Sequence, residues 1–176
     1  MRISVHIAIA TLALGLASAA LAEPSGTRSA AVLPARGILV AGTSLAGVRL
    51  RDSRAAVELA WGKHHTSCPG CPPRTWLFVY PDSPVGAAVS FDSSGRVVAV
   101  FTLGQPPGWH TQKGLWVGAD IHTMVARYDV PSMAYRACVG YSALSFGDGS
   151  VVTSIYTQAE SVYGFALTLR GEPVCR

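Results

Sequence analysis

The residues best suited to chemistry stand together at positions 64–71, in the order His-His-Thr-Ser-Cys-Pro-Gly-Cys. Histidine nitrogens and cysteine sulfurs are the usual ligands of zinc, and two cysteines separated by two residues are also the form of many thiol-redox sites. A third interpretation is a turn closed by a local disulfide. What precedes and follows this segment must decide among the three.

A redox cysteine needs a lowered pKa, which the N-terminus of a following helix commonly supplies. Residues 64–71 follow a predicted helix and precede two prolines and a predicted strand, so no helix follows them. A zinc site would require two adjacent histidines, whose side chains diverge, to reach one ion, and the chain lacks a second, separated pair of ligands. The residues of this zinc alternative are His64, His65, Cys68 and Cys71.

The interpretation we favour is a disulfide between Cys68 and Cys71, because the Pro-Gly pair between them promotes a tight reversal of the chain. The remaining cysteines, Cys138 and Cys175, would then form a second disulfide. That bond would close a loop of about 38 residues and stabilise the fold by roughly 3–4 kcal/mol on the chain-entropy model. Cross-pairings among the four cysteines remain the alternative.

No set of residues elsewhere in the sequence predicts catalysis. Ser142 lacks the second glycine of a nucleophile elbow, and His110 and His122 stand in an inter-segment loop and on a predicted helix. Asp92 and Asp120 occupy turn and helix-cap positions, where carboxylates bind main-chain amides. We therefore predict no catalytic residues, no cofactor and no metal.

The N-terminal residues are typical of a secretory signal peptide. Arg2 is followed by an apolar run over residues 3–19 and by Ala20-Leu21-Ala22, a small-X-small cleavage pattern. We therefore expect a signal peptide at residues 1–22, a flexible leader rich in small and polar residues at 23–36, and one folded domain at 37–176. The four cysteines would then meet an exported environment, either secreted or in the periplasm and cell envelope, where disulfides persist.

The charge pattern argues against two classes of partner. The net charge is +4, and the basic residues are scattered rather than grouped into a stripe that could follow a nucleic-acid backbone. No apolar run long enough to span a bilayer follows the signal peptide. The sequence therefore predicts neither nucleic-acid binding nor an integral membrane segment in the mature chain.

Two segments resemble each other and suggest an internal repeat. Residues 47–62 and 114–129 each combine a glycine, a short apolar piece, a capping residue and an amphipathic helix. The candidate cap is Asp52 or Ser53 for the first helix and Asp120 for the second. Runs rich in Val, Phe, Tyr and Thr, bounded by Asp, Gly and Ser, follow both helices and predict strands. These runs are residues 75–80, 86–91, 96–103, 140–146, 151–158 and 161–169. We therefore expect an α+β fold in which two helix-plus-hairpin copies, about residues 37–105 and 106–176, form one antiparallel sheet. The helices would cover one face, and the other face would be partly open.

The motif Gly114-Leu115-Trp116-Val117-Gly118, the helix after it and the hairpin from Phe91 to Val97 together resemble the beta-lactamase-inhibitor-protein-like fold. They also resemble related small outer-membrane-assembly lipoprotein modules. Arg51 stands where the first copy would carry its second glycine. The resemblance implies a non-enzymatic module that presents a sheet surface and loops to another protein.

Aromatic residues on an open sheet face are suitable anchors for such a partner. We assign Trp61, Phe91 and Phe101 to the core. The candidate protein-binding residues are Trp76, Tyr80, Trp109 and Tyr156. We therefore expect an exported, non-enzymatic module that binds an unknown protein through an open sheet face and loops. The alternative is a secreted enzyme, or a thiol-redox or zinc protein, centred on the loop of Cys68 and Cys71.

Overall fold

The computed structural model describes residues 33–80, 86–104, 108–147 and 149–176. The predicted signal peptide and most of the predicted leader lie outside these ranges. Of the leader's described part, Leu33 is buried and the main-chain oxygen of Pro34 accepts hydrogen bonds from Tyr80 (2.7 Å) and Trp109 (3.1 Å). Packing therefore begins upstream of Gly37. Within the described ranges, no helix is long and apolar enough to cross a membrane.

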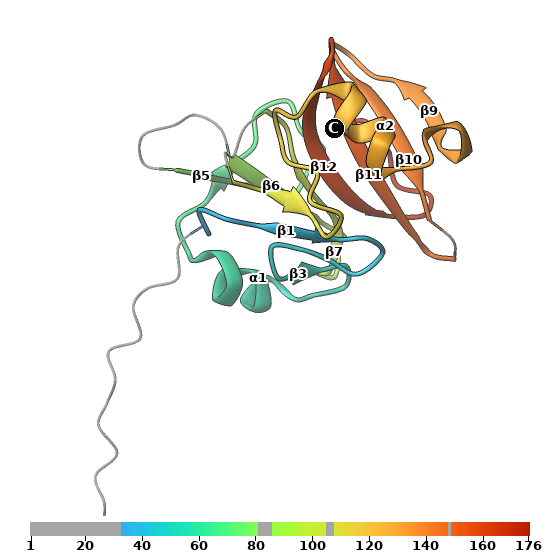
Figure 1. Cartoon of the computed structure of the whole chain (residues 1–176). Coiled ribbons are helices and arrows are strands. Elements are labelled where there is room, and N and C mark those ends of the chain that lie inside the picture. Colours follow the sequence, from blue (N-terminus) through green and yellow to red (C-terminus); the bar gives the residue numbers. More distant parts are fainter. Residues whose placement is uncertain (1–32, 81–85, 105–107, 148) are drawn as a thin grey trace, which may run out of the picture.

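Strands are the main regular structure of the described chain (Figure 1). The elements of the first part are β1 (Ile38–Val40), β2 (Ser44–Leu45), β3 (Val48–Arg49), α1 (Arg54–Trp61), β4 (Thr66–Ser67), β5 (Thr75–Val79), β6 (Gly86–Phe91) and β7 (Val97–Thr102). Those of the second part are β8 (His110–Thr111), α2 (Ile121–Arg127), the 3-10 helix η1 (Val130–Ser132), β9 (Ala134–Ala137), β10 (Ser142–Phe146), β11 (Val151–Gln158) and β12 (Ser161–Leu169).

Two sheets organise these strands. The larger is an eight-stranded antiparallel sheet in the order β4-β5-β6-β7-β12-β11-β10-β9, so that the strands following α1 and those following α2 meet where β7 pairs with β12. The smaller sheet has the order β3-β2-β1-β8, and β8 pairs in parallel with β1. In Figure 1, α1 and β1–β3 lie beside β5–β7, whereas α2 lies beside β10–β12.

The predicted fold, two helix-plus-hairpin copies forming one sheet covered on one face by helices, is wrong. Among the described residues, strands far outnumber helices (43% against 13%), and they include a second, four-stranded sheet. The α-helices have only eight and seven residues, too few to cover an eight-stranded sheet. The short strands β1–β3 and β8 cover this face of the large sheet together with the helices. Strands of two or three residues are too short to show an alternating pattern in the sequence, so the sequence did not predict them.

The predicted helix caps and strand positions agree with the structure better than the predicted overall fold does, because turn and cap residues act locally. Ser53 accepts a hydrogen bond from the Ala56 amide at the start of α1, and Asp120 accepts one from the Thr123 amide at the start of α2. The predicted runs 75–80, 86–91, 96–103, 140–146, 151–158 and 161–169 correspond to β5, β6, β7, β10, β11 and β12.

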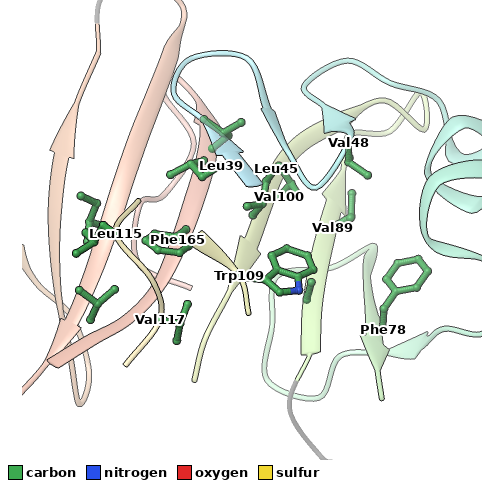
Figure 2. Packing of buried hydrophobic residues seen from close by; sticks show 14 of the residues in the cluster. Leu39, Leu45, Val48, Phe78, Val89, Val100, Trp109, Leu115, Val117 and Phe165 are labelled. Carbon is green, nitrogen blue, oxygen red and sulfur yellow. The ribbon is translucent and has the colours of Figure 1, made fainter. Parts of the chain in front are cut away.

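The main core fills the space between the large sheet on one side and the small sheet and helices on the other. Trp109, fully buried, lies between strands of the two halves (Figure 2). Its ring centroid is 5.8 Å from that of Trp61, which in turn meets Phe78 edge to face at 5.3 Å. Trp61, Phe91 and Phe101 are all buried, as the sequence predicted. Removal of these large apolar side chains from water stabilises the fold.

The opposite face of the large sheet carries a second, smaller cluster. Its buried members are Ala88, Ala99, Phe101, Ala143, Tyr156 and Ala166. The face that the sequence predicted to be partly open is covered at this cluster, because Cys71 from the β4–β5 loop, and Cys138 and Val174, pack against it. Alanines provide too little side chain to predict a second core from the sequence.

A substitution at Gly164 tests the junction of β7 and β12. A Cβ atom added there would lie 2.1 Å from the main-chain oxygen of Thr102, a contact that no side-chain movement relieves. We expect Gly164→Ala to lower the free energy of unfolding by about 3 kcal/mol, the upper part of the usual overpacking range. Urea unfolding measures this difference, with Ser161→Ala at the exposed start of β12 as control. Equal stability of the two variants would contradict the assigned register.

Candidate functional site

The loop after β4 is a disulfide-closed turn. The Cα atoms of Cys68 and Cys71 are 5.4 Å apart, and their sulfurs form a disulfide. The Cys71 amide donates to the Cys68 oxygen (3.3 Å), and the Cys68 amide donates to the Thr75 oxygen (3.2 Å). The loop leads directly into β5. The predicted pairing is therefore confirmed, and so is the second one, between Cys138 and Cys175 with Cα atoms 5.5 Å apart.

The two histidines of the motif have different surroundings. The His65 ring is stacked on Trp76, with centroids 3.8 Å apart and planes at 12°, and its Nε2 lies 3.8 Å from the Glu58 carboxylate. His64 is exposed. Within the described ranges, no group of three or more His, Cys, Asp and Glu side chains is arranged to hold a metal ion. The motif thus contributes a stacked ring and an exposed ring to the surface, beside a closed turn.

The same segment lines a cleft of about 650 Å³ at the edge of the large sheet. Most of the surface that lines the cleft is apolar. Its walls come from the N-terminal segment, the end of α1 and its following loop, and β5. They are formed by Leu33, Pro34, Ala35, Trp61, His64, His65, Thr66, Leu77, Val79 and Tyr80.

The register of β4 on β5 explains where the cleft opens. Thr66 pairs with Leu77 and Ser67 pairs with Trp76, and the pairing stops there. One residue earlier, His65 stacks on Trp76 instead of continuing the ladder along β5. Val79, beyond the last pair, keeps 41% of its surface exposed. The far end of β5 therefore borders the cleft without pairing to β4.

Tyr80 fixes the floor of the cleft. Its hydroxyl donates to the Pro34 oxygen at 2.7 Å and accepts from the Trp109 indole at 2.9 Å. Burial raises the pKa of Tyr80, with an opposing contribution from the Trp109 hydrogen bond, so the phenol stays protonated at neutral pH. This hydroxyl links the N-terminal segment to the core and holds Leu33 at the cleft wall.

The four aromatic residues predicted to bind a partner do not form one exposed surface. Trp109 and Tyr156 are fully buried, in the main core and in the second cluster respectively. Trp76 is half-buried beneath His65, with the Arg54 guanidinium 5.5 Å from its ring. Only Tyr80 reaches the cleft. The sequence argument did not identify Leu33 and Val79 as lining residues, although the alternation of Leu77 and Val79 along β5 was a usable signal.

Comparisons with family models, with curated proteins and with solved structures find no match to this chain. The resemblance to the beta-lactamase-inhibitor-protein-like fold therefore stays a prediction.

The two disulfides should differ in their contribution to stability. The Cys138–Cys175 bond joins residues 37 positions apart, whereas Cys68 and Cys71 are 3 apart. By the loop-length relation, replacing both cysteines of the long loop with serine should cost about 3–4 kcal/mol, and replacing both of the short loop about 2 kcal/mol. Thermal and urea unfolding of the two double variants measure this order. A smaller loss for the long loop would contradict the chain-entropy account of this tether.

Proposed function

We propose that the chain is an exported, non-catalytic module that binds an extended segment of another protein in the cleft beside β5. The observation that carries this proposal is the early end of the β4–β5 ladder within an apolar cleft. An edge whose pairing stops part-way can accept a further strand, and main-chain hydrogen bonds then supply affinity while pockets for alternate side chains supply specificity.

The cleft suits the side chains of such a segment. Its volume falls within the range of about 300–1,000 Å³ that is typical of ligand pockets. Leu77 and Val79, two residues apart on β5, lie along one wall of the cleft, and Leu33 lies on another. The polar groups at its rim are the two imidazoles and the Thr66 hydroxyl. The partner segment we propose is therefore extended, with apolar side chains at alternate positions facing the cleft.

Export is supported by two further observations. The structure contains two disulfides, a bond type that persists in oxidising compartments, and the sequence begins with a signal-like apolar run. The redox alternative is less well supported, because the Cys68–Cys71 turn is followed by strand β5 and so lacks a helix N-terminus to lower a thiol pKa.

A displayed library of random peptides, selected on the immobilised protein, tests the cleft. We expect enriched peptides with apolar residues at alternate positions and micromolar affinity. Val79→Glu should weaken their binding at least about tenfold, because it places a carboxylate in an apolar cleft at a cost above about 1.4 kcal/mol. Isothermal titration calorimetry of one selected peptide measures the change.

The control variant is Tyr135→Glu, which adds the same charge on the exposed strand β9 at the opposite edge of the large sheet. It should leave the affinity unchanged. Failure to enrich any peptide, or equal binding of the selected peptides to the Val79→Glu protein, would refute the proposed site.

A further inference from the structure

The last three residues, 174–176, are half-buried beside the second cluster of the large sheet, whereas residues 171–173 are exposed. Val174 packs on that cluster, and the next residue, Cys175, is joined to Cys138 beside β9. The tail thus crosses a face whose members are mostly alanines, which leave room for a main chain to lie close to the sheet.

Two tyrosine hydroxyls bind the main chain of this tail. Tyr156 donates to the Val174 oxygen at 2.6 Å. Tyr141 donates to the main-chain oxygen of Arg176 at 2.7 Å and accepts a hydrogen bond from its amide. The Tyr141 and Tyr156 rings contact each other edge to face, with centroids 5.1 Å apart. Recognition of an extended main chain by fixed side-chain hydroxyls is the kind of contact that peptide-binding sites use.

The side chain of Arg176 enters an aromatic slot. Its guanidinium carbon lies 5.6 Å from the centre of the Phe101 ring, within the range of a cation–π contact. The guanidinium nitrogens are buried and have no hydrogen-bond acceptor among the described residues. Burial lowers the pKa of Arg176, although Tyr156, Glu172 and Tyr141 oppose this effect. Among the described residues, the contact that favours the cation here is therefore the Phe101 ring and not a paired carboxylate.

We infer that this face is a binding site for an extended segment bearing an arginine side chain, and that the chain's own C-terminal residues occupy it as a built-in ligand held by the Cys138–Cys175 disulfide. The site is separate from the cleft beside β5, so it does not depend on the function proposed above. Its ligand class is defined by two main-chain oxygens and an amide that meet tyrosine hydroxyls, and by a guanidinium that meets Phe101.

The tether makes the built-in ligand hard to displace. Burying a guanidinium without an acceptor opposes docking, and only a few hydrogen bonds and one aromatic contact favour it. The disulfide keeps the tail next to its site and so gives it a high effective concentration. Once the tether is removed, a segment of the same chemistry from another molecule can compete for the site.

The test uses a full-length variant with three changes: Cys138→Ser, Cys175→Ser and Arg176→Gln. The first two remove the tether, and the third removes the cation from the competing tail. The probe is a synthetic peptide of residues 171–176 with serine in place of cysteine, labelled at its N-terminus. Fluorescence polarisation should show saturable binding to this variant and binding at least about tenfold weaker to the disulfide-intact protein. A matched peptide with citrulline, the neutral analogue of arginine, should also bind at least about tenfold weaker.

The inference is overturned if the folded triple variant does not bind the peptide, if the citrulline peptide binds as well, or if the intact protein binds equally. A second measurement needs no change of cysteine. Phe101→Leu keeps an apolar side chain but loses the aromatic face, so we expect the Arg176 amide to exchange its hydrogen at least about tenfold faster than in the unaltered protein. Leu103→Ile, at the edge of the same cluster, is the control. An unchanged Arg176 exchange rate in the Phe101→Leu protein also overturns the inference.

Discussion

The pairing of β7 with β12 is the contact on which the rest of the structure depends. Only three residue pairs join these strands, yet they unite the strands after α1 with those after α2 into one sheet. At this junction the Phe165 amide donates to the Thr102 hydroxyl at 3.1 Å, and Gly164 leaves space for the Thr102 carbonyl. Because the sheet is continuous across this junction, both of its faces extend over the two halves. Each face therefore needs other residues to cover it.

The two faces are covered in different ways because their side chains differ. The face with large apolar residues is covered by regular elements, which bury enough surface to stay in place without a covalent link. The face with alanines also carries hydroxyl pairs, Thr75 with Ser90 (2.8 Å) and Ser145 with Ser154 (2.9 Å). Such a face offers little apolar area to a cover. Its cover is a short loop and a short tail, and each is closed by a disulfide.

The sequence predicted what is decided over a few residues and not what depends on distant contacts. The Pro-Gly pair between Cys68 and Cys71 and the cap at Asp120 act within one turn, and these predictions were confirmed. Of the two candidate caps for α1, Ser53 is the one that caps the helix. The parallel pairing of β1 with β8 joins segments about seventy positions apart and involves only two residues of β8, so no local pattern signals it. The cleft was missed for the same reason, since Leu33, Val79 and Tyr80 come to line one cleft only through tertiary packing.

The two edges of the large sheet explain why a binding strand is expected at one and not at the other. All four residues of β9 are exposed, so this edge presents main-chain groups on the outside of the sheet. Arg136 stands in the middle of it, and a charged residue on a short edge strand opposes pairing with another chain. At the other edge, β4 protects only the first part of β5, and the rest borders an apolar cleft that can receive side chains. Of the two edges, only β5 would give an added strand buried apolar surface as well as hydrogen bonds, and this difference is why we propose the partner site there.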